Sequence, residues 1–247
     1  ILMKIELFQT ERLDEIKEFF GELIFPSNLN CIGCGESIWN KNPYSLCHSC
    51  YQKLEFTDQV CKHCGRRTLL GTSCFCQSEH YYFDSIDTCL VYNDFLQKLI
   101  FRYKYGHQTY LSRFFTEILI QKLNEKEIFY DYITYVPIHR NRMRERGFNQ
   151  TQLIAEMVGE HFSVPVVEFV TRTKDTPFLS SYRPFQRMLL VEDAFEHKEI
   201  EVQPKSNILL LDDIVTSGST LSTVSKVIKK EHDSLRVHCI TVGNARV

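Results

Sequence analysis

Residues 207–221 read NILLLDDIVTSGSTL and carry the strongest structural signal in the chain. Ile208 to Leu211 is a short, uninterrupted aliphatic run, which is typical of a central parallel strand covered on both faces. Two adjacent carboxylates, Asp212 and Asp213, follow where this strand is expected to end. Because a carboxylate that is buried and unpaired is strongly destabilising, we expect both acids to face a crevice.

The next residues form a loop rich in hydroxyl groups, and a segment with helical spacing of apolar residues follows at 218–231. Backbone N–H groups and the dipole at a helix N-terminus bind phosphate, and a glycine lets the ligand approach the backbone closely. A hydroxyl-rich loop is also compatible with simple helix capping. The order of strand, loop and helix predicts a phosphate-binding loop made of Thr216, Ser217, Gly218, Ser219 and Thr220.

The remainder of the chain alternates between strand-like and helix-like segments. We expect strands at 85–92, 131–138, 164–170 and 235–242, and helices at 5–25, 95–123 and 151–162. The helical segment at 95–123 is expected to break near Gly106, and residues 171–190 are expected to form a long loop. Strands that alternate with helices predict an α/β fold, with a parallel sheet flanked by helices.

Length and composition allow one ordinary domain and a smaller one, since the chain has 247 residues of which 43% are hydrophobic. We expect residues 1–80 to form an N-terminal helix and a cysteine-rich zinc-binding domain, and residues 81–247 to form the α/β domain. The formal net charge of -2 does not indicate a nucleic-acid or membrane partner, so any such role depends on local patches. No apolar run is long enough to span a bilayer and the first residues do not resemble a signal peptide, so we expect a cytoplasmic protein.

Eight of the ten cysteines lie between residues 31 and 76, in closely spaced pairs. In a reducing compartment such pairs favour metal over disulfides, and four thiolates complete a tetrahedral zinc shell. A complete shell leaves no position for water, so we expect two structural zinc ions. Sequential pairing gives one site from Cys31, Cys34, Cys47 and Cys50 and a second from Cys61, Cys64, Cys74 and Cys76, while a cross-braced pairing also fits the spacing. Cys89 and Cys239 lie in apolar runs and are expected to be buried thiols.

A basic segment, HRNRMRERGF at residues 139–148, follows the strand that ends at Val136-Pro137. We expect a loop at the same sheet edge as the phosphate-binding loop. Its cations could bind pyrophosphate as bidentate donors, contact a nucleic-acid backbone, or form an ordinary solvated charge run. They are His139, Arg140, Arg142, Arg144 and Arg146, and the patch could extend to Lys104, His107, Arg172, Lys174, Arg183 and Arg187.

The segment ILLLDDIVTSGSTL resembles the phosphoribosyl pyrophosphate (PRPP) motif of type I phosphoribosyltransferases. Together with VPIHRNRMRERGFNQTQLIAE, TRTKDTPF and the cysteine pairs, it makes the chain resemble the ComF family, competence proteins that couple a zinc-finger region to a phosphoribosyltransferase domain. The resemblance implies that residues 216–220 hold the 5′-phosphate. It also implies that Asp212 and Asp213 accept hydrogen bonds from the ribose hydroxyls beside a Mg²⁺ ion, and stabilise the charge that develops at C1′.

Two functions are compatible with this resemblance. The first is a DNA-uptake factor that handles single-stranded DNA alongside a helicase partner during natural transformation. The second is an active phosphoribosyltransferase that moves ribose-5-phosphate from PRPP to an unidentified acceptor. Relatives often carry a glutamine and an asparagine where this chain has Phe178 and Leu190, and no residue stands out as a reader of a nucleobase. The sequence therefore leaves turnover open.

Overall fold

The computed structural model describes residues 30–38, 42, 44–68, 74, 76, 80–126, 128–176 and 190–246. The helix expected at 5–25 lies outside these residues, as do Phe178, Arg183 and Arg187. The chain divides into two compact units, residues 1–53 and residues 54–247. The second group of four cysteines, beginning at Cys61, therefore falls in the same unit as the sheet.

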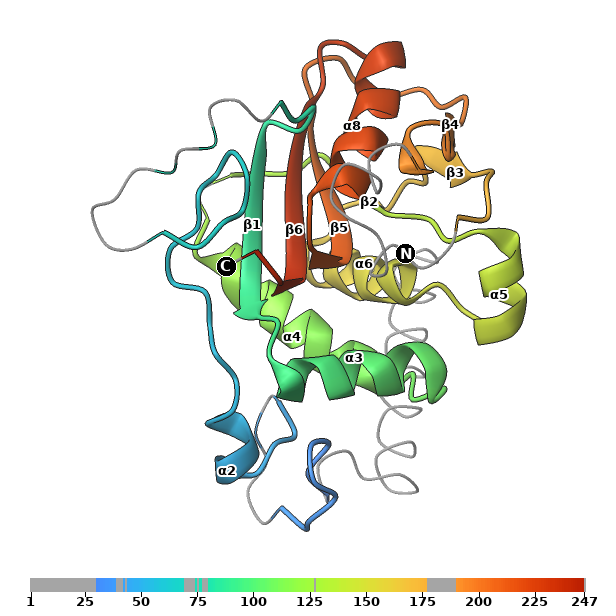
Figure 1. Cartoon of the computed structure of the whole chain (residues 1–247). Coiled ribbons are helices and arrows are strands. Elements are labelled where there is room, and N and C mark those ends of the chain that lie inside the picture. The colour runs from blue at the N-terminus through green and yellow to red at the C-terminus, as the bar shows by residue number, and fades with distance from the viewer. Residues whose placement is uncertain are drawn as a thin grey trace, which may run out of the picture. The chain divides into compact units, whose positions relative to one another are not determined.

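The larger unit is built on a four-stranded parallel sheet with the order β1-β6-β5-β2 (Figure 1). Its strands are β1 (Ser85–Val91), β2 (Tyr132–Tyr135), β5 (Asn207–Val215) and β6 (Arg236–Asn244). The long central strands β5 and β6 pair in parallel from Asn207 opposite Arg236 to Val215 opposite Asn244. The predicted parallel α/β architecture is confirmed.

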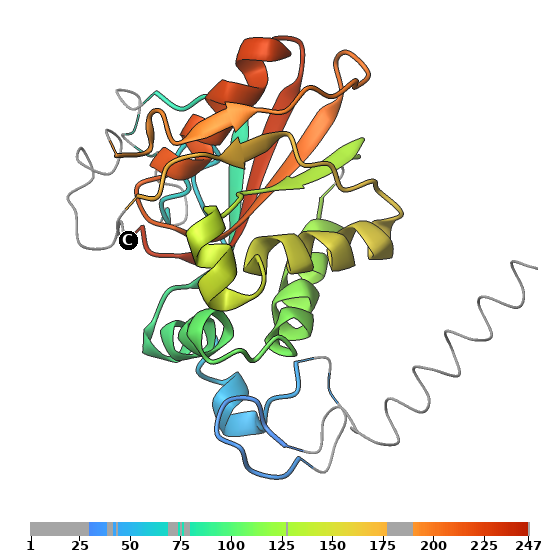
Figure 2. The same cartoon turned by 90° about the vertical axis from the view of Figure 1, so that its right-hand side faces the viewer.

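Helices and a small second sheet cover the two faces of this sheet (Figures 1 and 2). Helices α4 (Leu111–Asn124) and α6 (Gln150–Phe162) pack on one face, and α3 (Asp94–Tyr105) lies beside α4. The opposite face is covered by α8 (Ser219–Glu231) and by an antiparallel pair, β3 (Val170–Arg172) and β4 (Phe195–His197). No helix in the described part of the chain is long and apolar enough to cross a membrane.

The aliphatic run of β5 is continuous because both of its faces are covered. Ile208 and Leu210 pack into the core that includes Leu221, Val224 and Ile228 of α8. Leu209 and Leu211 are equally buried, and strand alternation directs them to the side of α4 and α6. Cys89 and Cys239 are buried as expected.

One expectation for the connections needs correction. The strand expected at 164–170 is reduced to a single parallel bridge between Val166 and Ile133, and β3 begins only at Val170. Pro165 lacks an N–H group and cannot donate to a neighbouring strand, although its carbonyl accepts from Ile133 N at 2.9 Å. The strand β4 was not anticipated. The expected break near Gly106 is confirmed, because α3 ends at Tyr105 and α4 begins at Leu111.

Candidate functional site

The predicted ligand-binding residues meet at the carboxyl edge of the parallel sheet. The connection from β5 to α8 contains residues 216–218, and the connection from β2 leads into a helix that begins at Arg140. In open α/β sheets this edge is where ligands bind. The topology therefore brings the acids, the hydroxyl-rich loop and the basic segment to one side of the domain.

The two adjacent acids lie within β5 and not beyond its end. The strand continues to Val215, and Asp212 is in register with Thr241 of β6. The expectation that the strand ends at Leu211 is therefore wrong. Because side chains alternate along a strand, Asp212 and Asp213 point to opposite faces of the sheet.

Asp213 is compensated by contacts from the side of α3 and α6. It forms an ion pair with Lys104 of α3, and Nε2 of Gln150 lies 3.5 Å from its Oδ2 atom. Burial by itself raises the pKa of Asp213, but the Lys104 ammonium outweighs burial and holds this pKa below its usual range. Asp213 is thus an ionised group that the domain itself stabilises.

Asp212 lies in a different electrostatic environment. Burial, followed by the charge of Asp213, raises the pKa of Asp212 to about 8. Arg172 of β3 is electrostatically coupled to it, and burial together with the charge of Arg142 lowers the pKa of Arg172 to about 10. Among the described residues, Nε of Arg172 is buried without a hydrogen-bond partner. The carboxyl group of Asp212 and the guanidinium group of Arg172 therefore lie on this side of β5. A bound ligand or cation could stabilise the charged form of each.

The hydroxyl-rich loop leads directly into α8. Gly218 takes the left-handed conformation, with φ 80°, and occupies the N-cap position of the helix. It has no side chain to accept from the first N–H groups of α8, which leaves room for an anion there. Ser217 Oγ lies 2.7 Å from Ser219 Oγ, and Ser219 N donates to Ser217 Oγ at 3.3 Å. Thr216 is exposed, and Ser219 and Thr220 are partly exposed.

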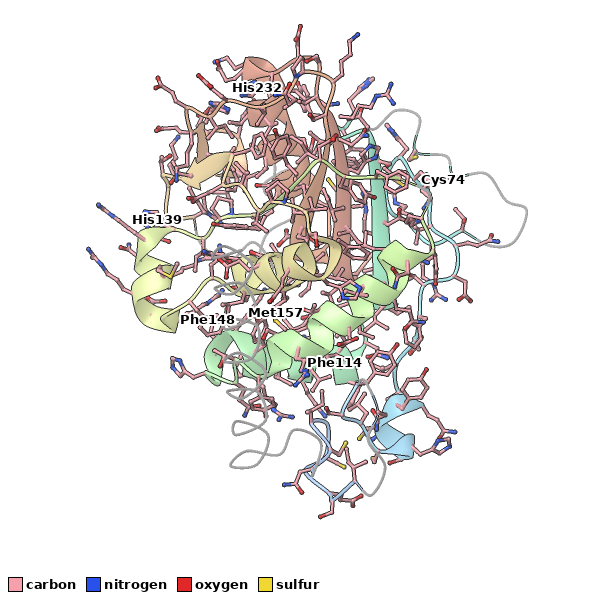
Figure 3. All side chains as sticks on the ribbon, turned by 180° about the vertical axis from the view of Figure 1, so that it is seen from behind. Cys74, Phe114, His139, Phe148, Met157 and His232 are labelled. Carbon is pink, nitrogen blue, oxygen red and sulfur yellow. The ribbon has the colours of Figure 1, made fainter. Side chains whose placement is uncertain are left out.

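The basic segment forms the seven-residue helix α5 (Arg140–Arg146), which corrects the expectation of a loop. The His139 side chain caps its N-terminus, accepting from Asn141 N at 3.3 Å. Gly147, with φ 78°, ends it. Arginine, methionine and glutamate favour helix, and a glycine in the left-handed region is a common helix stop. Figure 3 shows His139 at one end of α5 and Phe148 just beyond the other.

The four arginines of α5 do not form one uniform patch. Arg142 Nη2 donates to the carbonyl of Thr176 at 2.6 Å. Arg146 is buried and donates to Gln150 Oε1 and to the Tyr105 hydroxyl, both at 3.0 Å. Arg140 and Arg144 are exposed. Two arginines thus stabilise the domain and two face solvent.

The segment RGFNQ at residues 146–150 has a structural explanation at every position. Phe148 packs on Tyr103 with ring centroids 5.5 Å apart. Asn149 caps α6 by accepting from Thr151 N at 3.1 Å. Gln150, the first residue of α6, links Arg146 to Asp213. The segment therefore connects the basic helix to the acid that is paired with Lys104.

The two cysteine groups share one backbone turn. Gly35 N donates to Cys31 O at 2.8 Å, and Gly65 N donates to Cys61 O at 2.7 Å. Both glycines have a positive φ, 82° at Gly35 and 78° at Gly65, which side chains rarely tolerate. The repeated Cys-x-x-Cys-Gly pattern is therefore a repeated loop that presents two thiols to one point.

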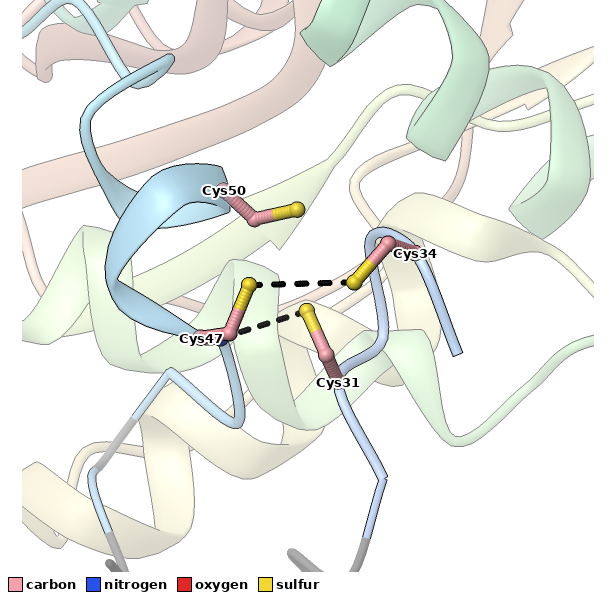
Figure 4. A group of neighbouring side chains, drawn as sticks. All are labelled: Cys31, Cys34, Cys47 and Cys50. Carbon is pink, nitrogen blue, oxygen red and sulfur yellow. Dashed lines mark hydrogen bonds between the residues drawn. The ribbon is translucent and has the colours of Figure 1, made fainter. Parts of the chain in front are cut away.

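The first group contains Cys31, Cys34, Cys47 and Cys50, whose sulfur atoms are turned toward one another (Figure 4). Cys34 Sγ lies 3.7 Å from Cys47 Sγ, and Cys50 comes from the short helix α2 (His48–Tyr51). A tetrahedral shell with Zn–S bonds of about 2.3 Å separates its sulfurs by about 3.8 Å, so this group fits zinc. A contact with the Ser49 hydroxyl is the main cause that lowers the pKa of Cys47 to about 6, whereas burial raises the pKa of Cys50 in the same group.

The second group consists of Cys61, Cys64, Cys74 and Cys76. The sulfurs of Cys61 and Cys76 lie 3.6 Å apart, and those of Cys64 and Cys74 lie 3.5 Å apart. In both groups all four sulfurs lie within 4.8 Å of one another. The cysteines are thus grouped sequentially, and both groups have the composition and spacing of a structural zinc site.

Several residues of this edge were not singled out by the sequence pattern. Lys104 and Arg172 were expected only to extend a basic patch, although they adjoin the two acids from opposite sides. Tyr81 donates to the carbonyl of Ser217 in the hydroxyl-rich loop, and Arg246 lies beside Gly218, although both are far from the loop in the chain. Gln150, which contacts Asp213, lies in the segment RGFNQ, and this motif could have identified it as a site residue.

Comparison with known proteins gives a domain match and several homologues. Residues 20–78 match the double zinc ribbon domain. The chain is 26% identical to competence protein F of Haemophilus influenzae, over 85% of this chain and 88% of that protein. It is 25% identical to competence protein ComFC of Bacillus subtilis, over 80% and 83%. DNA utilization protein YhgH of Escherichia coli is 30% identical over 40% of this chain and 43% of that protein. The double zinc ribbon match and the two cysteine groups support structural zinc.

The chain also resembles solved structures of phosphoribosyltransferases. Adenine phosphoribosyltransferase of Saccharomyces cerevisiae aligns with 57% of this chain and 72% of its own, at 16% identity and a TM-score of 0.38. Xanthine-guanine-hypoxanthine phosphoribosyltransferase of Helicobacter pylori aligns with 54% of this chain and 82% of its own, at 14% identity and a TM-score of 0.31.

Proposed function

We propose that this chain, a homologue of competence proteins F and ComFC with a double zinc ribbon match, takes part in DNA uptake and binds PRPP or a related phosphorylated ribose. One observation carries the ligand proposal. The glycine-capped N-terminus of α8 lies at the end of the strand that holds Asp212, whose pKa is raised to about 8. A proposed phosphate-binding loop and a carboxyl group that forms no ion pair among the described residues thus follow each other within six residues of chain.

Each part of the ligand has a matching group. The 5′-phosphate would be bound by backbone N–H groups and hydroxyls of residues 216–220. Asp212 would accept a hydrogen bond from a ribose hydroxyl. Asp213, which Lys104 and Gln150 contact, would keep a negative charge next to Asp212 in the chain. Arg172, with its buried Nε atom, and the α5 arginines supply donors for pyrophosphate.

Mg²⁺ fits the chemistry of Asp212. A carboxyl group kept mostly neutral by burial and by a neighbouring acid is one that a nearby cation would ionise. Bound together with pyrophosphate, Mg²⁺ would supply positive charge that offsets the phosphate oxygens. Asp212 is the residue we assign to hold it.

Single-stranded DNA is the nucleic-acid partner that we propose. Arg140 and Arg144 are exposed and available for phosphate contacts. On α3, Phe101 is 62% exposed and its ring centroid lies 5.0 Å from that of Tyr105, which offers a surface on which bases could stack. A DNA-uptake helicase as partner, and a cytoplasmic location where the thiolates stay reduced, complete the proposal.

The second candidate function is phosphoribosyl transfer to an unidentified acceptor. It is favoured by Asp212 on β5, because this carboxyl group, once a bound cation ionises it, would place negative charge near C1′ and stabilise the cationic character that develops as pyrophosphate leaves. Release of pyrophosphate from PRPP in the presence of a metabolite pool would establish turnover. PRPP binding without release would leave the binding role alone.

The test compares PRPP with inorganic phosphate by calorimetry on zinc-loaded protein with Mg²⁺. Asp212→Asn should weaken PRPP binding roughly tenfold or more, the size of a lost charge-assisted hydrogen bond, and leave inorganic phosphate within about twofold. Equal losses for both ligands would mean that Asp212 shapes the loop and does not contact the sugar. Undiminished PRPP affinity would place the ribose site elsewhere.

A further inference from the structure

A chain of hydrogen bonds joins the second cysteine group to the hydroxyl-rich loop. Arg246 is buried, and its Nη1 atom donates to the carbonyl of Cys64. Its Nη2 atom donates to the Tyr81 hydroxyl at 2.7 Å. The Tyr81 hydroxyl in turn donates to the carbonyl of Ser217 at 3.3 Å. A single guanidinium group and a single phenol therefore connect a cysteine of the metal site to the loop assigned to phosphate.

A second connection holds the guanidinium group in this position. Arg246 N donates to Asn244 Oδ1 at 2.8 Å, and Asn244 Nδ2 donates to the carbonyl of Gly65 at 2.8 Å. Gly65 is the glycine of the same Cys-x-x-Cys-Gly turn, and Asn244 is the last residue of β6. Two consecutive carbonyls of the turn, those of Cys64 and Gly65, are therefore held from the end of β6.

The loop also packs directly on this bridge. A Cβ atom at Gly218 would lie 3.1 Å from Cε1 of Tyr81 and 3.3 Å from Nη1 of Arg246. The His63 ring, from inside the same Cys-x-x-Cys turn, lies against Tyr81 with centroids 5.6 Å apart. A side chain at position 218 would thus be strained by the positive φ and would press on Tyr81 and Arg246, so the position of the loop depends on where these two side chains lie.

We propose that Arg246 and Tyr81 are positioning residues that fix the hydroxyl-rich loop according to the metal-bound geometry of the second cysteine group. A zinc ion on four thiolates leaves a net negative site, beside which a buried arginine is electrostatically stable. Without the metal the turn of Cys61 to Gly65 loses its constraint, Arg246 loses fixed acceptors, and the loop loses its contact through Tyr81. The first cysteine group lies in the other unit and has no part in this proposal.

The test uses Tyr81→Phe, which removes the bridging hydroxyl and keeps the ring, with Tyr82→Phe as the matched control. Tyr82 is 49% exposed, and the Lys226 ammonium lies over its ring, 5.4 Å from the centroid. Amide hydrogen exchange of residues 216–220 should be roughly fivefold faster in Tyr81→Phe, as expected for one lost hydrogen bond, and unchanged in Tyr82→Phe. Zinc content should stay the same in both variants.

A second arm compares Cys74→Ser with Cys34→Ser, one variant for each cysteine group. Each should lose about one zinc ion, but only Cys74→Ser should speed exchange at residues 216–220. Equal exchange in the two tyrosine variants, or zinc loss in Cys74→Ser with an unchanged loop, would overturn the proposal.

The inference rests on the proposed phosphate role of this loop, and the two can fail separately. Calorimetry with inorganic phosphate tests the proposed function, and Tyr81→Phe should weaken phosphate binding by roughly the same fivefold. If wild-type protein does not bind phosphate, the function fails while the exchange data still decide the coupling.

Discussion

Asp212 and Asp213 should respond in opposite ways to the same conservative substitution. Asp213→Asn leaves the Lys104 ammonium without its partner, in a pair whose side chains are only 18% and 12% exposed. Removal of one partner from a buried ion pair destabilises by roughly 3–5 kcal/mol, and we expect about 3 kcal/mol because neither side chain is fully buried. For a chain of this length that corresponds to a fall in Tm of roughly 6–12 °C.

Asp212→Asn should be neutral or slightly stabilising at pH 7. The folded-state pKa of Asp212, about 8, lies above its unfolded value, so the folded chain holds an extra proton between about pH 4 and pH 8. Wild-type stability should therefore fall as the pH rises through that window. The Asp212→Asn variant should lack this part of the pH dependence of stability. Asp213, with a lowered pKa, contributes stability that is lost only as the pH falls below its unfolded value of about 4.

Thermal unfolding of both variants in zinc-containing buffer at pH 5, 7 and 9 would measure this difference. Asp193→Asn is a suitable control, because Asp193 is 80% exposed and its partner Lys174 is 59% exposed, so the substitution should change little. Similar losses at pH 7 in the Asp212 and Asp213 variants would refute the assignment of the two acids to different environments.

Three further results are expected. Elemental analysis should find about two zinc ions per chain, and Cys31→Ser should remove about one while leaving the α/β sheet folded, as judged by circular dichroism. Alanine at both Arg140 and Arg144 should flatten the salt dependence of single-stranded DNA binding without lowering Tm; an unchanged slope would place the DNA surface elsewhere. Gly218→Ala should weaken phosphate binding and lower Tm, because φ 80° strains an alanine and its Cβ atom would press on Tyr81 at 3.1 Å; normal phosphate affinity would contradict this.

The features that could be predicted from sequence are those encoded locally. The aliphatic run of β5 and the spacing of the cysteine pairs each specify a structure within a few residues. The helix α5 was missed because its cap is a histidine, which is not among the residues that usually start helices. The pairing of β3 with β4 depends on segments more than 20 residues apart.

The surroundings of Asp212 and Asp213 could not be predicted either, because they depend on residues that are distant in the chain. Lys104 and Gln150 contact Asp213 from two different helices, and neither their spacing nor their residue type predicts these contacts. The continuation of β5 through Asp212 was also not evident, since paired aspartates are uncommon in strands. Long-range pairing with Thr241 and Gly243 of β6 outweighs that weak local preference.

The opposite orientation of the two acids has a consequence for how such chains can diverge. A descendant could replace Asp212 by asparagine and keep its fold, because an amide oxygen can still accept from Asp213 N, and no ion pair among the described residues involves Asp212. Replacement of Asp213 by a neutral residue would leave the Lys104 ammonium without its ionic partner, unless Lys104 changed in the same lineage. We therefore expect position 212 to drift alone among relatives that have given up the ligand, and positions 213 and 104 to change together.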